Sequence, residues 1–327
     1  MTDSTIKKEV VLVGTSFKGR QPLGIHLLAE AVELGVNQKY FASLYLAPDD
    51  AELEKTYEDL LAKEAEVYGF STAIWNGELF TEVARKLKKA RPQSKIVFGG
   101  PFASGLADKI LNDTSEIDYV IAGEAEKALP LLLMDTELSE VPNLVYRKEG
   151  RVVGTFKDKM DLEDTLMIHQ IPGYQKYLDS MPGLTAELET QRDCPHTCGF
   201  CTWAGQTDTV EWQDKNQKLG KRSFKLELAI EGLKNMLNKP SVKSLFVIDA
   251  DMLNRKKDEA LKLLSVLEEN NYQNKKIILE ADPSCWHPQV LEKAATLSFL
   301  ELACGFQSKH DDVLKMMGRR NNSTRLK

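Results

Sequence analysis

Short apolar runs alternate with amphipathic segments along the first 122 residues. Residues 10–17 read Val-Val-Leu-Val-Gly-Thr-Ser-Phe, an apolar run closed by Gly and Ser that is typical of a strand buried on both faces. Pro22 then opens a helical pattern that ends at Gly35. We expect further strands at 40–47, 67–74, 95–99 and 118–122, and helices at 51–65 and 77–91. This rhythm predicts a doubly wound parallel sheet.

A second alternation begins at Thr185, after a less regular stretch. Residues 134–183 predict one hairpin, around Glu149-Gly150, and turns at two Pro-Gly pairs. Beyond them we expect strands at 185–192, 244–250, 276–281 and 299–306, and helices at 224–237, 256–270, 288–297 and 311–317. Four strand–helix units in succession are the pattern of a β/α barrel or part of one. The expected division is a first domain at 1–140, a linker at 141–183 and a second domain at 184–327.

The residues that follow the strands are candidate site residues, because ligands of parallel sheets bind at the carboxyl ends of the strands. Three such ends in the first domain are rich in small residues, namely Ser71-Thr72, Gly99-Gly100 and Gly123-Glu124. Small residues let a bulky ligand approach the backbone closely. The alternative is that they are turn residues without a ligand. No G-x-G-x-x-G follows the first strand, which disfavours a dinucleotide site.

Three of the five cysteines lie within eight residues. Cys194, Cys198 and Cys201 are spaced C-x₃-C-x₂-C in the loop after the first strand of the second domain. Thiolates suit soft metal ions and iron–sulfur clusters. Three thiolates can hold three irons of a [4Fe–4S] cube and leave the fourth iron open to a small molecule. A structural zinc ion with His196 or His169 as fourth ligand is the alternative, although the spacing is unusual for zinc.

Composition narrows the class of protein. A length of 327 residues, with 42% hydrophobic and 28% charged residues, is ordinary for a globular protein of about two domains. With a net charge of −6, the chain lacks the excess of basic residues that is typical of a nucleic-acid-binding protein, so we expect no nucleic-acid partner. The N-terminus has no apolar signal core, and no stretch approaches about 18 apolar residues, so we expect a cytoplasmic protein without a membrane partner. Five cysteines, an odd number, also argue against a disulfide framework.

With Phe200 before its last cysteine, the cysteine loop resembles the signature of the radical S-adenosylmethionine (SAM) superfamily. The resemblance implies that the three cysteines ligate a [4Fe–4S] cluster whose open iron takes the amino and carboxylate groups of SAM. Reduction, by a donor such as flavodoxin or ferredoxin, would cleave a carbon–sulfur bond and give a 5′-deoxyadenosyl radical. Later strand ends also resemble this family and imply SAM contacts at Phe200, Asp249, Glu280, Gln307 and Ser308. For each acid taken alone, a solvated strand end is the alternative.

The order of elements in the first domain resembles the cobalamin (B12)-binding domain that precedes many radical SAM enzymes. This resemblance implies that the corrin and its nucleotide tail lie near Ser71, Thr72, Gly99, Gly100, Gly123 and Glu124. The chain lacks the Asp-x-His-x-x-Gly sequence whose histidine replaces the lower cobalt ligand. In this it is similar to members of the radical-enzyme branch that bind the corrinoid without that histidine.

The expected fold is therefore α/β, with an N-terminal Rossmann-like sheet followed by a partial radical SAM barrel of about four strand–helix units, where the family usually has six. The resemblance implies methyl transfer to a carbon or phosphorus of a small molecule or peptide, with methylcobalamin as the relay. Radical rearrangement or ring formation is the alternative within the family. We expect either a C-terminally truncated enzyme or a barrel completed by a partner chain. A catalytically silent cluster- or corrinoid-binding subunit is the non-enzymatic alternative.

Overall fold

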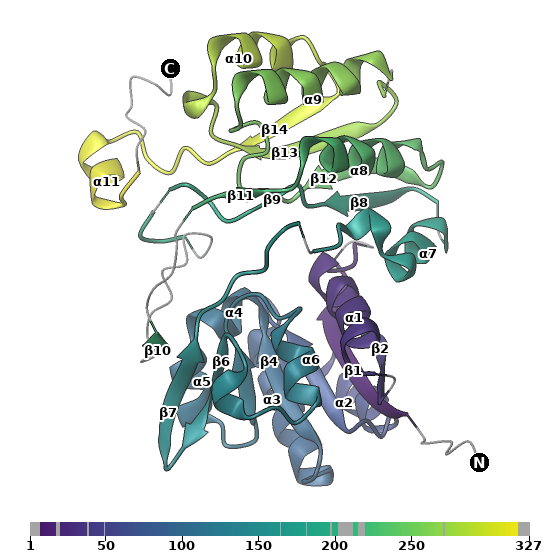
Figure 1. Ribbon diagram of the computed structural model, residues 1–327, viewed down its shortest axis with the longest axis vertical. Helices are drawn as coiled ribbons and strands as arrows, with labels where there is room; N and C mark the ends of the chain where they lie inside the picture. Colours follow the sequence, from purple (N-terminus) through teal and green to yellow (C-terminus); the bar gives the residue numbers. More distant parts are fainter. Residues whose placement is uncertain are drawn as a thin grey trace. The chain divides into compact units, whose positions relative to one another are not determined.

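The computed structural model describes residues 7–17, 20–37, 39–48, 50–163, 165–180, 182–196, 198–201, 212–214, 220–270 and 272–319. The chain divides into two compact units, each with a sheet of its own in which most strands are parallel (Figure 1). The first unit is Met1–Asp161 with Thr207–Lys218, and the second is Leu162–Gln206 with Leu219–Lys327. Within the described residues, no helix is both long and apolar enough to cross a membrane.

The first unit is built on an eight-stranded sheet in the order β10-β7-β6-β5-β4-β3-β1-β2. Its parallel strands are β1 (Lys8–Thr15), β2 (Tyr40–Ala47), β3 (Val67–Ser71), β4 (Lys95–Gly99) and β5 (Tyr119–Ile121). The hairpin of β6 (Leu144–Lys148) and β7 (Arg151–Phe156) continues the sheet in antiparallel fashion, and β10 (Trp212–Asp214) pairs with β7. The order 2-1-3-4-5 of the parallel strands puts the topological switch point between β1 and β3.

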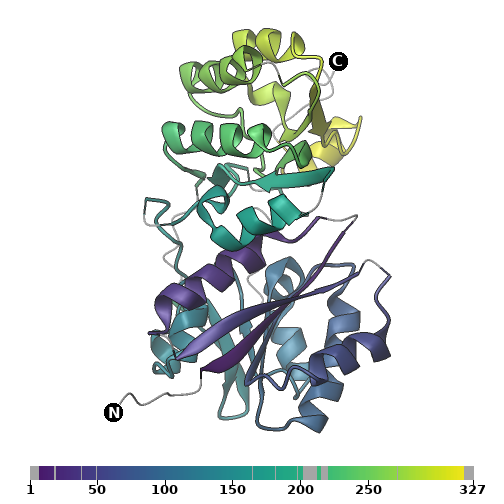
Figure 2. The same cartoon turned by 90° about the vertical axis from the view of Figure 1, so that its right-hand side faces the viewer.

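Helices cover both faces of this sheet, which confirms the predicted doubly wound architecture. Helices α1 (Leu23–Gly35) and α6 (Ala128–Leu133) pack on one face. The other face carries α2 (Leu53–Leu61), α3 (Gly77–Ala90), α4 (Gly100–Gly105) and α5 (Ala107–Asp113). In Figure 2 the strands lie between the purple helix α1 and the blue helices.

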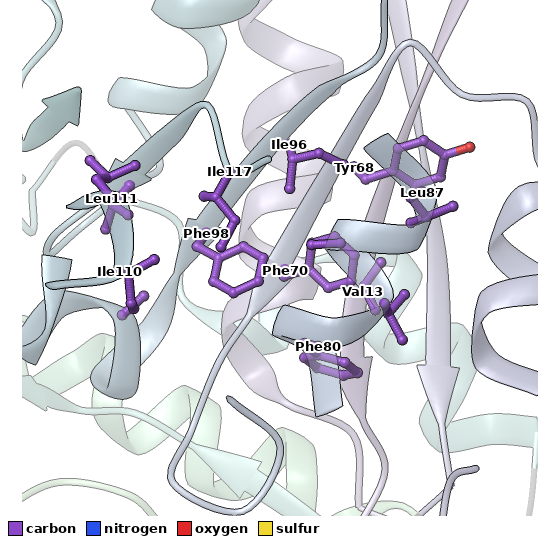
Figure 3. Close-up of a cluster of buried hydrophobic side chains, with 14 of the residues drawn as sticks. Val13, Tyr68, Phe70, Phe80, Leu87, Ile96, Phe98, Ile110, Leu111 and Ile117 are labelled. Carbon is purple, nitrogen blue, oxygen red and sulfur yellow. The ribbon is translucent and has the colours of Figure 1, made fainter. Parts of the chain in front are cut away.

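The first unit has two hydrophobic cores, one on each face of its sheet, and alternate residues of a strand pack into one core or the other. Val11 and Val13 of β1 belong to one buried cluster, while Val10 and Leu12 belong to the other. In the first cluster Phe70 lies 5.4 Å from Phe80 and 5.1 Å from Phe98, between ring centroids (Figure 3). Burial on both faces explains why these strands are continuous apolar runs rather than alternating ones.

The second unit has a four-stranded parallel sheet in the order β14-β13-β12-β8. The strands are β8 (Leu184–Leu188), β12 (Val242–Val247), β13 (Lys276–Ala281) and β14 (Leu300–Cys304). The helices are α7 (Pro172–Ser180), α8 (Leu226–Asn238), α9 (Lys257–Glu269), α10 (Pro288–Ala295) and α11 (Asp311–Met316). Successive strand–helix units thus lie side by side, as part of a β/α barrel requires.

The two faces of this second sheet differ. Leu188 faces helix α8, where a Cβ on Gly232 would come within 3.0 Å of its side chain. The neighbouring Glu187 is paired in register with Phe246, and Phe246 with Ile278, and all three are only partly buried. The sheet therefore has a helix-covered apolar face and a more open face that carries polar side chains.

Several short elements are absent from the sequence-based prediction. They are helices α4 to α7, the two-residue strands β9 (Gln191–Arg192) and β11 (Arg222–Ser223), and the 3₁₀ turns η1 (Leu138–Glu140), η2 (Ile168–Gln170) and η4 (Pro283–Cys285). Strands β9 and β11 form an antiparallel ribbon. The strand predicted at 185–192 is therefore two strands, with Glu189 and Thr190 between them.

Candidate cofactor sites at the carboxyl ends of the two sheets

The start of the cysteine loop is fixed to the end of strand β12. The carboxylate of Asp249, which is 1% exposed, accepts hydrogen bonds from the amides of Thr190 at 2.6 Å and Gln191 at 2.9 Å. The Thr190 hydroxyl also donates to it. Arg255 donates to the carbonyl and hydroxyl oxygens of Thr190, both at 2.9 Å. Four residues after Thr190, the chain reaches Cys194.

Burial dominates the electrostatics of this anchor. It raises the pKa of Asp249 to about 6, although the hydrogen bonds from Thr190 and Gln191 and the charge of Arg255 act in the opposite direction. The predicted SAM contact at Asp249 stays a prediction. In the structure, the hydrogen bonds of this carboxylate go to the chain itself, so Asp249 positions the loop.

The three cysteines lie in one loop and interact with each other. Cys198 is buried, and Cys194 and Cys201 are half-buried. Burial raises the pKa of the Cys194 thiol, and the neighbouring Cys201 and Cys198 raise it further. The amide of Cys201 donates to the carbonyl of Cys198 at 3.0 Å. Asp193, just before the first cysteine, has a φ of 65°, a conformation that non-glycine residues rarely adopt outside functional sites and turns.

Residues after β14 hold the other side of this loop. The amide of Gly199 donates to the carbonyl of Met317 at 3.0 Å. The Arg319 guanidinium donates to the carbonyl of Gly305 at 2.7 Å and lies 3.9 Å from the Cys198 Sγ. Arg319 therefore places a hydrogen-bond donor beside the buried sulfur of the loop.

The geometry of the thiols favours a cluster over a single zinc ion. With Zn–S bonds of about 2.3 Å, tetrahedral zinc places its sulfur ligands about 3.8 Å apart. Among the described residues, which include all three loop cysteines, the only metal-ligand group with atoms mutually within 4.8 Å is a different one. A cluster that gives each thiolate its own iron accommodates wider spacing. As placed, the three sulfur atoms are therefore not all close enough to one another for a single zinc ion.

The other residues predicted to contact SAM lie at the carboxyl ends of β13 and β14 and in the cysteine loop. Glu280 is on the open face of the second sheet, and partial burial raises its pKa. Gln307 has a φ of 59°, and its amide folds back over Gly305. Ser308 accepts the amide hydrogen of His310 at 3.1 Å, and Phe200 is 48% exposed. These contacts stay predictions.

Asp251 is a site residue that the sequence-based set omitted. It is 3% exposed, and it accepts hydrogen bonds from the Trp286 indole at 2.8 Å and the Asp282 amide at 3.2 Å. Burial raises its pKa to about 6. Its only sequence signal was its spacing of two residues from Asp249 after a buried strand, which puts both acids at the same strand end.

At the carboxyl edge of the first sheet, Thr72 joins two strands. Its hydroxyl donates to the Gly99 carbonyl at 2.7 Å and accepts the Ala103 amide at 3.0 Å. Next to it, Gly100 has a φ of 87°, and a Cβ there would lie 2.5 Å from the Thr72 carbonyl oxygen. Ser71 is the last residue of β3 and is half-buried. The predicted small residues after β3 and β4 therefore form one tightly packed edge.

Two further connections complete this edge. Asn76 donates to the Thr15 hydroxyl at 2.7 Å and accepts the Ala73 amide at 2.7 Å, so it spans the switch point between β1 and β3. Gly123 has a φ of 135°. The Glu124 carboxylate accepts the Met160 amide at 2.7 Å, which ties the loop after β5 to the segment after β7.

Large apolar side chains stand exposed around the switch point. Phe17, after β1, is 44% exposed, and Ile74 and Trp75, after β3, are 84% and 70% exposed. Large apolar patches on a surface mark ligand or partner contacts, whereas single exposed apolar residues are common. These three side chains lie where a doubly wound sheet binds its ligand. Of the tryptophans near the cysteine loop, Trp203 lies outside the described residues.

Comparisons with known proteins agree with this geometry. Residues 10–133 match the family model of the B12 binding domain. Anaerobic magnesium-protoporphyrin IX monomethyl ester cyclase of Synechocystis sp. is 26% identical over 138 residues, which are 40% of this chain and 27% of that protein. The cobalamin-dependent radical SAM methyltransferase TokK of Streptomyces tokunonensis is 27% identical over 172 residues, 48% of this chain and 24% of TokK. The aligned part of this chain thus covers about a quarter of each relative.

Solved structures match almost the whole chain. The cobalamin-dependent SAM radical enzyme OxsB, with aqua-cobalamin and SAM bound, gives a TM-score of 0.72 at 16% identity, covering 98% of this chain and 47% of OxsB. The radical SAM methyltransferase TsrM from Kitasatospora setae gives 0.71 at 13% identity, covering 98% of this chain and 64% of TsrM. The segment that matches the B12 binding domain lies in the first unit, and the chain has, along almost its whole length, the fold of OxsB and TsrM.

Proposed function

We propose that this chain binds cobalamin on its first unit and a [4Fe–4S] cluster with SAM on its second, and that it serves radical methyl transfer. One observation carries the proposal: Cys194, Cys198 and Cys201 share a loop at the carboxyl end of β8, which Asp249 anchors on one side and Met317 on the other. The similarity to TokK, which is named as a methyltransferase, supports the reaction class.

The side chains of the second unit have distinct roles in this proposal. The three thiolates hold the cluster, which supplies the electron for cleavage of SAM. Arg319 supplies a hydrogen-bond donor to the Cys198 sulfur. Glu280, on the open face, accepts hydrogen bonds from a polar group of SAM. Gln307 and Ser308 lie at the same end of the sheet, beside the proposed SAM site. An exposed Phe200 offers its ring to the adenine or the methionine chain.

The first unit supplies the corrin site. Gly99 and Gly100 let the chain after β4 pack closely against its neighbours, and the Thr72 hydroxyl is bonded within the chain, so these residues give the edge its shape. Ser71, Gly123 and Glu124 border the same edge of the sheet. Cobalamin supplies a methyl carrier there, and the proposed acceptor is a carbon or phosphorus of a small molecule or peptide. A flavodoxin or ferredoxin is the proposed electron donor.

Anaerobic reconstitution with iron and sulfide tests the cluster. We expect about four irons per chain, and 5′-deoxyadenosine when SAM and dithionite are added. Cys198→Ala should lose most of the iron, whereas the matched variant Cys304→Ser, outside the loop, should retain it. Iron at trace levels in the unmodified chain would contradict the cluster assignment.

Cobalamin binding is measured separately. We expect the chain to retain a corrinoid absorption spectrum through gel filtration after incubation with hydroxocobalamin. Replacement of Trp75 by Ala should weaken retention, because that exposed ring would lose its contact with the corrin. If none of the corrinoid elutes with the unmodified chain, the proposed cobalamin site of the first unit is contradicted. The proposed cluster site of the second unit would be unaffected by that result.

A further inference from the structure

Three side chains of metal-ligand type meet beside the cysteine loop without belonging to its thiol set. They are His196, Asp282 and Cys285, and their ligand atoms all lie within 4.8 Å of one another. The His196 Nε2 and the Cys285 Sγ are 3.7 Å apart. The histidine comes from the cysteine loop, whereas the other two come from the η4 turn after strand β13.

We propose that His196, Asp282 and Cys285 form a zinc site, separate from the site of Cys194, Cys198 and Cys201. Imidazole, carboxylate and thiolate are the ordinary zinc ligands. Zn–S and Zn–N bonds of about 2.3 and 2.05 Å place sulfur and nitrogen about 3.6 Å apart in tetrahedral geometry, close to the observed separation. Three protein ligands leave the fourth position to water.

The turn that carries two of the ligands is held in place by buried groups. The Cys285 amide donates to the Asp282 carbonyl at 2.9 Å. The Asp251 carboxylate accepts the Asp282 amide at 3.2 Å and the Trp286 indole at 2.8 Å, so it anchors both ends of the turn. Asp251 and Trp286 are 3% and 8% exposed. A fixed turn presents its ligands without a large ordering cost, as second-shell support does in metal sites.

Two ligands of this site are anionic once the metal is bound, and they outweigh the cation beside them, Arg319. The Asp282 carboxylate accepts the Ser284 hydroxyl at 2.6 Å and lies 3.7 Å from the Arg319 guanidinium. These contacts orient the carboxylate, whose two oxygens offer about four acceptor positions in total. Binding deprotonates the Cys285 thiol, and the proton goes to solvent. Zinc then balances the thiolate and carboxylate charges.

Cobalt(II) is the probe for the first experiment, because a thiolate–cobalt bond gives a charge-transfer absorption band. The variant carries Ala at Cys194, Cys198 and Cys201, so that the loop thiols cannot contribute. We expect one cobalt per chain with this band, and its loss on addition of zinc. Adding Cys285→Ser should abolish the band, whereas adding Cys304→Ser should retain it, since Cys304 is on β14 and outside the site. A band that survives Cys285→Ser, or its absence in the parent variant, overturns the proposal.

A second measurement uses the unmodified chain with its three loop cysteines occupied by reconstituted iron. Zinc should slow alkylation of Cys285 by iodoacetamide at least about ten-fold and leave Cys304 unchanged, as read by peptide mass spectrometry. The variant Asp251→Asn should weaken zinc protection about ten-fold, within the range for second-shell groups. Equal Cys285 alkylation rates with and without zinc overturn the proposal, whatever the activity with SAM.

Discussion

The carboxylate of Asp249 and the amide of Thr190 are joined by a 2.6 Å hydrogen bond between residues 59 positions apart. It connects the end of β12 to the end of β8, just before the cysteine loop begins. An isolated buried carboxylate is costly, and here three donors from Thr190 and Gln191 satisfy it. The loop thus has a fixed starting point before any ligand binds.

Asp249→Asn should weaken this anchor. An amide group puts N–H donors where the backbone already donates, so at least one bond is lost. We expect the free energy of unfolding to fall by about 1–3 kcal/mol, measured by urea denaturation, with lower iron retention. The control is Asp258→Asn, whose side chain is 90% exposed. Equal stability of the two variants would contradict the anchoring role.

Gly100→Ala should damage the first unit more than a matched glycine variant. Gly100 and Gly150 have φ values of 87° and 78°, but only at Gly100 does a Cβ meet a neighbour, the Thr72 carbonyl oxygen at 2.5 Å. Both variants should lose about 1 kcal/mol from the left-handed conformation. Gly100→Ala should lose about 1–3 kcal/mol more from overpacking and retain less corrinoid. The measurements are urea midpoints and corrinoid absorbance, and equal losses would refute the close-packing argument.

His26 should make the first unit sensitive to acid. Burial lowers the pKa of this 3% exposed histidine to about 4, below its ordinary value of 6.5. The unfolded state therefore binds a proton at a higher pH than the native state. The contribution to stability is complete above pH 6.5 and declines as the pH falls toward 4.

Comparison with His26→Gln isolates this effect from other titrating groups. Between pH 6.5 and 4, the unmodified chain should lose about 3 kcal/mol of unfolding free energy relative to the variant. Urea denaturation at a series of pH values measures the difference. A difference that does not change with pH would show that His26 titrates normally in the folded chain.

Arg319→Leu should make the cluster harder to reduce. A guanidinium next to the Cys198 sulfur stabilises the more negative, reduced cluster, so its removal lowers the reduction potential. A charged hydrogen bond of about 1.4 kcal/mol corresponds to about 60 mV for one electron. Potentiometric titration followed by electron paramagnetic resonance measures the shift. Lys315→Ala removes an exposed charge from α11 and should shift the potential by much less, and equal shifts would count against a specific contact.

The elements that the sequence could predict are those with a long or strongly apolar pattern. Strands β1, β3 and β4 are buried on both faces, so their sequences are apolar runs that predicted them. Helices α4 and α6 have only six residues each, less than two turns, so no helical periodicity could be recognised. Helix α7 was interpreted as a turn because it opens with Pro172-Gly173, although proline is favoured in the first turn of a helix.

The candidate sites divide in the same way. The spacing of Cys194, Cys198 and Cys201 is local, so the sequence alone identified the loop. Whether the Asp249 carboxylate faces a ligand or the Thr190 backbone depends on a contact between distant residues, which no spacing rule contains. The same holds for His196 and Cys285, which are 89 residues apart and meet only because β8 and β13 belong to one sheet.

Strand β10 has a consequence for how the chain can be divided. It pairs with β7 in the first unit, although the flanking segments Leu162–Gln206 and Leu219–Lys327 belong to the second unit. The polypeptide therefore passes between the units three times. A first unit that ended at residue 161 would lack β10, so β7 would keep β6 but lose its outer neighbour, and the Trp212 ring, which is 5% exposed, would be missing from its core. The two units are thus not two consecutive segments of the chain. Recombination that exchanges one unit for that of a relative must also transfer β10 with the first unit.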